Sequence, residues 1–273
     1  MQEFKDKAVL ITGSGRGIGK RLAIGFATAG ARVGLVARSK PELELTRLEI
    51  EHAGGAALHL RADVRDPDSI RSAVERMRAH FGAIQVVVCA AGVQGPIGPF
   101  AETAPPDWID TIQTNLVGVM NTCAAVLPEM IQCRAGKIIV VGGGGGAKPR
   151  PGFTAYGASK AAVIRFTESL AEELRDHNVQ INCMAPGGAY THMTDEILRA
   201  GDKAGHKEIE EAQRVRITGG IPAEKQVALA MFLASERSNH VSGKLLHVQD
   251  DWKKLAESSL HPEMYTLRRV MKV

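Results

Sequence analysis

The chain of 273 residues is long enough for one large domain or two small ones. Hydrophobic residues make up 44% and charged residues 23%, which excludes a disordered chain. Aromatic residues make up only 4%, which argues against an antibody-like sandwich and against aromatic platforms for single-stranded nucleic acid. The 34 basic and 30 acidic residues are interspersed, and a formal charge of +4 favours neither a nucleic-acid nor a membrane partner.

The cysteines Cys89, Cys123, Cys133 and Cys183 are far apart in the sequence and form no CxxC pair. This spacing predicts reduced, buried thiols in a cytoplasmic protein, and neither a disulfide framework nor a metal site. The first residues contain no apolar signal-peptide core, so we expect no secretory leader. Two uncharged stretches, 81–101 and 111–128, contain proline, glutamine or asparagine, so we expect buried soluble structure there and no membrane span.

Short apolar runs and amphipathic segments alternate along the chain. The apolar runs predict strands at residues 7–12, 32–37, 56–61, 84–89, 137–141, 179–184 and 244–248. Helical spacing predicts helices at 18–29, from 41 onward, and at 67–80, 107–130, 154–175 and 222–234. Gly30 fits the end of the first helix, Pro41 the first turn of the second, and Asp66 the N-cap of the third.

Strand–helix alternation of this kind specifies a parallel sheet with helices on both faces, because each crossover connection is right-handed and covers a face. We therefore expect an α/β fold with a single doubly wound Rossmann-type domain and a central, mostly parallel seven-stranded sheet. The domain would span residues 1–250, and residues 251–273 would form a C-terminal extension. The charged stretch 191–221 lies outside the alternation.

A glycine-rich loop, Thr-Gly-Ser-Gly-Arg-Gly-Ile-Gly at residues 12–19, lies between the first predicted strand and its helix. Glycines at such a turn let the backbone approach a pyrophosphate, which then lies at the positive end of the helix. A tight turn without a ligand is the simpler alternative. The strand before the loop and the helix after it favour nucleotide binding.

At this point the chain resembles the short-chain dehydrogenase/reductase family, from residue 5 to about residue 248. The motifs that carry the resemblance are the loop at 12–19, Asp63-Val64, Ala90-Ala91-Gly92, Asn115, Tyr156-Gly157-Ala158-Ser159-Lys160, and Pro186-Gly187 followed by Thr191. The family motif at 90–92 usually begins with two asparagines, which are absent here. The resemblance implies that the stretch at about 191–221 is a substrate lid.

The resemblance and the loop together define the expected cofactor site. Its residues are Gly13, Ser14, Arg16, Gly17, Ile18, Gly19, Arg38, Asp63, Val64, Ala90, Ala91, Gly92, Tyr156, Lys160, Pro186, Gly187 and Thr191. At the end of the second strand, an acidic residue would bind the ribose 2′-hydroxyl of NAD, whereas this chain has Arg38. Arg38 and Arg16 suit a 2′-phosphate, so we expect NADP(H) in preference to NAD(H). The alternative is an unpaired surface arginine.

Tyr156 and Lys160 are four residues apart and share one face of a helix. A nearby ammonium would stabilise the tyrosine phenolate and bring its pKa from about 10 towards neutrality. The resemblance implies that Tyr156 is the general acid or base, that Lys160 assists it, and that Asn115 supports a proton relay. Without the other motifs, a surface tyrosine and lysine would be the better interpretation.

One position departs from the family pattern. The family usually has a serine 13 residues before its tyrosine, where it orients the substrate carbonyl. This chain has Gly143 there, within a run of five glycines at 142–146. Backbone N–H groups of this loop could bind the carbonyl oxygen instead. The alternative is a flexible loop and an impaired site. The nearest residue before Tyr156 that carries a hydroxyl group is Thr154, at the start of the same helix.

The leading hypothesis is an NADP(H)-dependent oxidoreductase that transfers a hydride between the cofactor and a small-molecule carbonyl/secondary alcohol pair. The alternatives are a catalytically impaired NADP-binding protein with a regulatory or scaffold role, and an epimerase or dehydratase. Apolar residues of the long helix predict burial against a partner subunit; they are Val117, Val119, Ala124, Val126 and Leu127. The resemblance implies a two-fold four-helix interface and a homotetramer, with a homodimer as the smaller assembly. The apolar residues of the extension would pack on a neighbouring subunit or on the lid; they are Trp252, Leu255, Met264, Tyr265 and Leu267.

Overall fold

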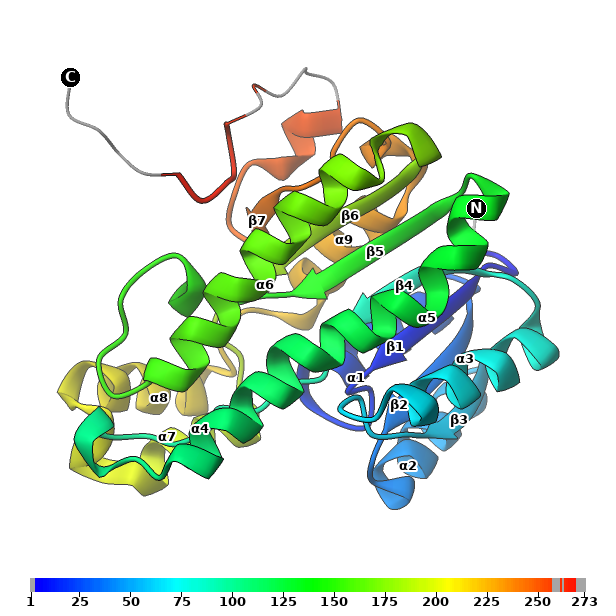
Figure 1. Cartoon of the computed structure of the whole chain (residues 1–273). Coiled ribbons are helices and arrows are strands. Elements are labelled where there is room, and N and C mark those ends of the chain that lie inside the picture. The colour runs from blue at the N-terminus through cyan, green and yellow to red at the C-terminus, as the bar shows by residue number, and fades with distance from the viewer. Residues whose placement is uncertain (1–2, 257–260, 262, 269–273) are drawn as a thin grey trace.

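The computed structural model, described over residues 3–256, 261 and 263–268, is built on a sheet with the strand order β3-β2-β1-β4-β5-β6-β7 (Figure 1). Every neighbouring pair of strands is parallel. The strands are β1 (Ala8–Thr12), β2 (Arg32–Ala37), β3 (Ala56–Arg61), β4 (Ile84–Cys89), β5 (Gly136–Val141), β6 (Val179–Ala185) and β7 (Leu245–His247). The predicted doubly wound Rossmann-type fold is confirmed, and this sheet is parallel throughout.

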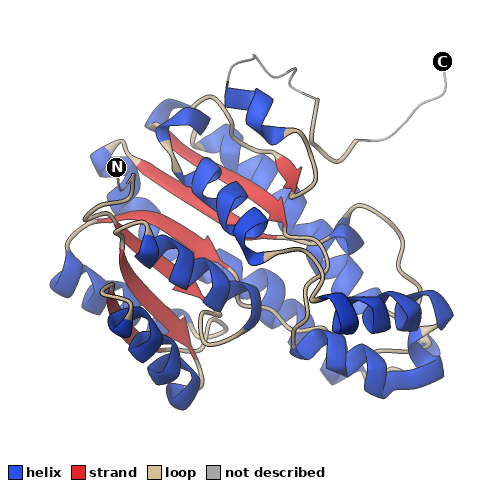
Figure 2. Cartoon of the chain, turned by 180° about the vertical axis from the view of Figure 1, so that it is seen from behind, coloured by secondary structure: helices blue, strands red, loops and turns tan. Residues whose placement is uncertain are grey.

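Each face of the sheet is covered by three helices (Figure 2). One face packs on α1 (Gly17–Thr28), α2 (Lys40–His52) and α9 (Ala223–Ala234), and the other on α3 (Pro67–Phe81), α5 (Gly118–Cys133) and α6 (Thr154–Glu173). Successive residues of β1 alternate between the two cores: Val9 and Ile11 face the first, and Ala8 and Leu10 the second. All five β1 residues are buried, as expected for a strand between two helical layers.

The helix ends follow the signals in the sequence. The Asp66 carboxylate accepts a hydrogen bond from the Asp68 N–H at 3.0 Å and caps α3. Gly30 follows α1 with a φ of 93°, a conformation that glycine adopts at little cost. The Ser39 hydroxyl, which the prediction did not use, accepts from the Glu42 N–H and caps α2.

The predicted long helix at 107–130 consists of three parts. It begins as α4 (Pro105–Ile112), continues as a π-helical turn at Gln113–Val117, and ends as α5. By length and composition this stretch, Pro105–Cys133, could cross a membrane, and it is the one such helix among the described residues. It packs here against α3, β4 and β5, and Asn121 donates from its side chain to the Val64 carbonyl, contacts typical of a core helix.

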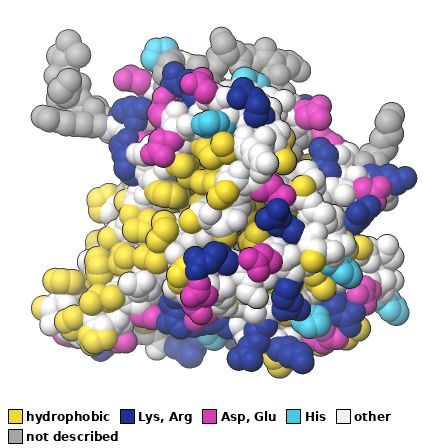
Figure 3. All heavy atoms as spheres, turned by 45° about the vertical axis from the view of Figure 1, so that its right-hand side comes forward, with side chains coloured by type: hydrophobic (Ala, Val, Ile, Leu, Met, Phe, Trp, Pro, Cys, Tyr) yellow, Lys and Arg dark blue, Asp and Glu magenta, His cyan; other side chains and the backbone are white. Residues whose placement is uncertain are grey.

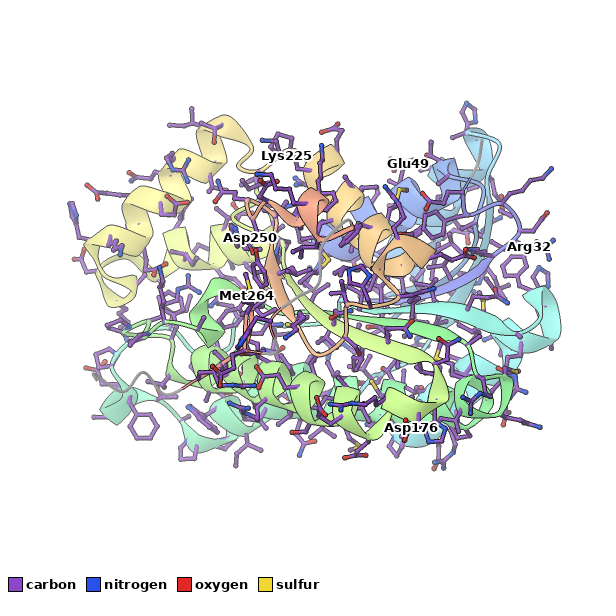
Figure 4. The ribbon with its side chains drawn as sticks, turned by 90° about the horizontal axis from the view of Figure 1, so that it is seen from above. Arg32, Glu49, Asp176, Lys225, Asp250 and Met264 are labelled. Atoms are coloured by element: carbon purple, nitrogen blue, oxygen red, sulfur yellow. The ribbon has the colours of Figure 1, made fainter. Side chains whose placement is uncertain are left out.

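The chain between β6 and α9 forms a two-helix excursion, α7 (His192–Ala200) and α8 (His206–Thr218). Its two ends meet in an antiparallel bridge between Ala189 and Gly220, and the Ile221 N–H donates to the Gly188 carbonyl at 2.7 Å. Seen from above, Arg32 and Asp176 lie at one end of the sheet and these two helices at the opposite end (Figure 4). The excursion therefore covers the carboxyl ends of the strands.

The described part of the C-terminal extension packs on the chain's own core and not on the two-helix excursion. Trp252 is buried against Phe232 of α9, with ring centroids 5.2 Å apart, and Leu255 is buried beside them. The Leu245 N–H of β7 donates to the Tyr265 carbonyl, and the Leu267 N–H donates to the carboxylate of Glu168. Met264 is exposed.

Two predictions about single residues need correction. Cys89, Cys123 and Cys183 are free and buried as expected, but Cys133, at the end of α5, is exposed. Val119 and Val126 contribute to the chain's own core, so they are not surplus apolar surface. Of the other predicted residues, Ala124 is exposed, and Val117 and Leu127 are partly buried. The large exposed apolar side chains of this region are Phe100, Ile109 and Met120.

Candidate active site

A cavity of about 700 Å³ opens at the carboxyl ends of the strands, beneath α7 and α8. Its walls come from the glycine-rich loop, the ends of β2, β4 and β5, the start of α6, and the excursion. Every residue of the predicted site lines it except two. Ser14 is fully buried, with its hydroxyl directed at the Val36 carbonyl, and Asn115 lies behind the wall. The sequence motifs therefore converge on one place.

The glycine-rich loop makes a close crossing at the start of α1. A Cβ placed on Gly19 would lie 2.2 Å from the Gly13 carbonyl oxygen, so only glycine fits there. The first turn of α1 contains no acidic residue, so the positive end of its dipole is unopposed. A close backbone approach at a helix N-terminus is the arrangement that binds a pyrophosphate. The loop fits a dinucleotide.

Arg16 and Arg38 both border the far end of the cavity, and both are exposed. The structure adds Glu42, which the sequence interpretation missed: its carboxylate lies 3.6 Å from the Arg16 guanidinium and also lines the cavity. The spacing of Ser39 and Glu42 matches a helix-capping pattern that could have indicated this position. Arg16 is thus already paired with the carboxylate of Glu42.

Asp63 follows β3, and its carboxylate is held by the guanidinium of Arg65 at 2.7 Å. This hydrogen-bonded pairing keeps the pKa of Asp63 below its usual value, so the carboxylate is ionised at neutral pH. Thr12 supports the neighbouring wall: its hydroxyl accepts hydrogen bonds from the N–H groups of Ala90 and Ala91. These two hydrogen bonds hold the turn after β4 in place, although it lacks the two asparagines with which the family motif usually begins.

Tyr156 and Lys160 lie in the first two turns of α6 and both line the cavity. Lys160 Nζ donates to the Val141 carbonyl at 2.8 Å and lies 5.6 Å from the centroid of the Tyr156 ring. Burial lowers the pKa of Lys160 to about 8. Burial also raises the pKa of Tyr156, which Arg150 lowers to a smaller extent. The expected lowering of the tyrosine pKa is therefore wrong.

Asn115 lies in the π-helical turn and is fully buried. Its side chain donates to the Val93 carbonyl and to the Ser159 hydroxyl, and it accepts from the Val93 N–H at 2.8 Å. The amide thus fixes the turn after β4 to α6. π-Helical turns are frequent at functional sites because they redirect a side chain within a helix.

Thr114, next to Asn115, was not predicted. Its hydroxyl is buried and lines the cavity, and it has no hydrogen-bond partner among the residues that the structure describes. Buried polar atoms are usually hydrogen-bonded, so an unpaired one in a cavity wall suits a polar ligand.

The glycine run at 142–146 forms a loop with a 3₁₀ turn at Gly144–Gly146. The Gly142 N–H donates to the Met184 carbonyl and the Gly146 N–H to the Gly143 carbonyl, so these two amides are already engaged. A Cβ placed on Gly143 would lie 2.9 Å from Tyr156 Oη. Thr154 does not replace the missing hydroxyl, because it accepts a hydrogen bond from the Trp108 indole and does not line the cavity.

Comparisons with known proteins decide the family. A model described as short chain dehydrogenase matches residues 7–201. The chain belongs to this family. The chain is 32% identical over 243 residues to the 3-oxoacyl-(acyl-carrier-protein) reductase FabG of Staphylococcus aureus. The aligned region covers 89% of this chain and 96% of the relative.

Solved short-chain dehydrogenase structures have the same architecture. A gluconate 5-dehydrogenase from Burkholderia cenocepacia, in complex with NADP and tartrate, superposes with a TM-score of 0.80 at 31% identity, covering 90% of this chain and 94% of the other. An NAD⁺-bound xylitol dehydrogenase superposes with a TM-score of 0.81 at 26% identity, covering 90% and 98%. The chain is therefore a short-chain oxidoreductase, and its neighbours include both NADP and NAD complexes.

Proposed function

We propose that this short-chain dehydrogenase interconverts a carbonyl and a secondary alcohol with NADP(H). The observation that carries the proposal is that Tyr156 and Lys160 line one cavity with the glycine-rich loop. A dinucleotide held by these residues would supply or accept the hydride. Tyr156 gives its proton to the carbonyl oxygen during reduction, and the raised pKa keeps it protonated at neutral pH. The relatives named above include one reductase and two dehydrogenases.

Lys160 and Asn115 support Tyr156 in this proposal. Lys160 binds the ribose of the cofactor and supplies the positive charge that stabilises the phenolate once it forms. Asn115 holds the turn at Val93 through two hydrogen bonds and joins it to α6 through a third, to Ser159, which fixes one wall of the cavity. The remaining residues of the predicted cofactor site bind the dinucleotide along the cavity.

The preference for NADP(H) rests on Arg38. Its guanidinium lines the cavity where β2 ends, whereas Arg16 shares its charge with Glu42. A 2′-phosphate would form charge-assisted hydrogen bonds with a guanidinium, which are stronger than neutral ones. The complex of the gluconate 5-dehydrogenase with NADP supports this assignment, and the NAD⁺ complex of the xylitol dehydrogenase is the reason to test it.

The deciding experiment is NADPH consumption by the wild-type protein across a panel of ketones and aldehydes, beside Tyr156→Phe. We expect the wild type to consume NADPH. Tyr156→Phe should lose this turnover and still bind NADPH with the affinity of the wild type. We also expect NADPH to bind more tightly than NADH, and Arg38→Asp to reverse that order. Equal affinities at moderate salt would contradict the cofactor assignment.

Two other functions remain as outcomes of the same experiment. NADPH binding without turnover on any carbonyl favours a catalytically impaired regulatory or scaffold protein, a possibility that the absent hydroxyl at Gly143 raises. Product formation without net consumption of the cofactor favours an epimerase or dehydratase. We further propose a cytoplasmic homotetramer that acts on a small molecule, on the basis of the buried free thiols and the exposed apolar residues.

A further inference from the structure

Arg150 lines the cavity, and none of the roles above uses it. It lies on the loop between β5 and α6, six residues before Tyr156, and its side chain is only 19% exposed. Its guanidinium carbon lies 3.8 Å from the centroid of the Phe153 ring and 5.6 Å from that of the Tyr156 ring. Burying a cation in this way is costly unless a partner or a ligand offsets the cost.

The partner in the structure is Glu208 of α8. Arg150 Nη2 donates to Glu208 Oε2 at 2.7 Å, and this ion pair joins the loop to the two-helix excursion. A guanidinium has five N–H donors, and the hydrogen bonds of the described residues account for one of them. The pair thus balances the charge of Arg150 and leaves donors over for an oxygen atom in the cavity.

Arg150 and Tyr156 border the same small space. A Cβ placed on Gly145 would lie 3.5 Å from Tyr156 Cε1 and 3.6 Å from Arg150 Cδ, so the bare glycine keeps the space between them open. Gly143 lies close to the hydroxyl end of the same ring. Residues 141–152 carry no hydroxyl group, so no side-chain O–H of this loop can serve a substrate oxygen there.

We propose that Arg150, held by Glu208, donates a hydrogen bond to the carbonyl oxygen of the substrate, the task that the absent hydroxyl at position 143 leaves open. The inference rests on the proposed function. On reduction, the carbonyl carbon receives the hydride from the cofactor and the oxygen receives the proton from Tyr156. Arg150 stays protonated and transfers nothing; its N–H stabilises the negative charge that develops on the oxygen.

The ion pair also indicates the charge of the substrate. Because Glu208 already balances the guanidinium, a second anion beside it would meet the carboxylates of Glu208 and Glu211, which line the same wall. A neutral oxygen acceptor meets no such repulsion. The substrate class is therefore a carbonyl compound, or the corresponding alcohol, without an anionic group next to the reacting carbon.

The first test is Arg150→Gln, with Arg150→Lys as a second variant. We expect kcat for a neutral ketone to fall by about a hundredfold in Arg150→Gln, as when one oxyanion donor is removed, with KM changed far less. Arg150→Lys keeps the charge but loses the planar fork, and it should restore part of the rate. The matched control is Arg175→Gln, which removes an exposed ion pair with Glu172 and should leave kcat unchanged.

NADPH affinity and the thermal midpoint, measured on the same variants, separate a folding defect from a catalytic one. Wild-type activity that Tyr156→Phe abolishes but neither Arg150 variant reduces would overturn this inference and leave the proposed function intact. Absence of turnover in the wild type would instead overturn the proposed function, and this inference with it.

The second test changes the partner. Glu208→Gln keeps a hydrogen-bond acceptor for Arg150 but leaves the guanidinium charge unbalanced. With an oxo acid and its methyl ester as matched substrates, we expect the wild type to prefer the ester, and the ratio of kcat/KM to shift at least tenfold towards the acid in the variant. A wild-type preference for the acid would contradict the proposed substrate class.

Discussion

The hydroxyl of Tyr156 is approached closely by backbone at Gly143, where a Cβ would lie 2.9 Å from Oη. The φ of Gly143 is 171°, an extended conformation open to any residue, so the constraint there is space and not backbone strain. Any side chain at position 143 must therefore displace the tyrosine ring or shift the loop. The glycine is matched to the observed position of Tyr156.

Gly143→Ser should accordingly lower turnover and not rescue it. We expect kcat to fall by about 10- to 100-fold, because a small displacement of the reacting group is enough for such a loss. Gly143→Ala is the control that separates the added volume from the added hydroxyl, and it should lose a similar factor. Faster reduction of small ketones by Gly143→Ser would mean that the glycine is a defect.

Lys160, which is buried, and Tyr156, which is partly buried, predict a pH profile. Lys160, with a pKa of about 8, loses its positive charge as the pH rises through that value, whereas Tyr156, with a raised pKa, still holds its proton there. We expect the rate of carbonyl reduction to be constant below about pH 8 and to fall above it, because the positive charge that stabilises the phenolate disappears. Initial rates at saturating NADPH measure this, and a rate that rises above pH 8 would contradict it.

The sequence was sufficient to place Tyr156 and Lys160 together, because four residues along a helix make one face. It was not sufficient for Arg150 and Glu208, which are 58 residues apart and meet only because the excursion folds over the loop. The pKa of Tyr156 was predicted in the wrong direction for a related reason. Burial depends on the whole surroundings of the ring, which local spacing does not describe.

At the scale of elements, the alternation of apolar runs located the strands of the described chain to within one or two residues. The signal is strongest for strands that are buried on both faces, such as β1. The π-helical turn at Gln113–Val117 was not predicted, because it lies inside one continuous helical stretch and no glycine or proline within Gln113–Val117 marks it. The position of the C-terminal extension was also not predictable. Its few apolar residues could be buried against several surfaces.

The extension gives a stability prediction. Trp252 contributes to the same core as α1 and α9, and it packs on Phe232. We expect Trp252→Ala to lower the free energy of unfolding by about 3–5 kcal/mol, measured by chemical denaturation. Met264→Ala, in an exposed position of the extension, is the control and should change it by less than about 0.5 kcal/mol. A loss below about 1 kcal/mol for Trp252→Ala would contradict this packing.

At the scale of the whole molecule, hydrophobic side chains gather over a broad area of the face seen in Figure 3. The large exposed apolar residues include Phe100, Ile109 and Met120, which belong to the region of α4 and α5. Monomeric proteins rarely expose large continuous apolar patches, which more often mark an interface. Self-association through a two-fold axis would bury the same patch of both copies.

We therefore expect light scattering at micromolar concentration to give the mass of a tetramer, or of a dimer as the smaller assembly. Ile109→Glu should reduce the mass, because it places a charge in the apolar patch. Ile217→Glu is the control. Ile217 is more exposed than Ile109 but lies on α8 of the two-helix excursion, outside the patch, so the variant should leave the mass unchanged. A wild-type monomer would refute the proposal.

The bridge between Ala189 and Gly220 holds the two ends of the excursion together, just after β6 and just before α9. The length of the excursion is therefore independent of the strand spacing, and lengthening a closed loop costs little, about 0.6 kcal/mol for each doubling. A helix pair of another length could be grafted between Gly188 and Ile221 while β6 and α9 stay in place, provided that it keeps Thr191 at the cavity and a carboxylate that pairs with Arg150. The bridge thus uncouples the length of the excursion from the packing of the sheet, so the excursion can vary while the sheet and its covering helices stay unchanged.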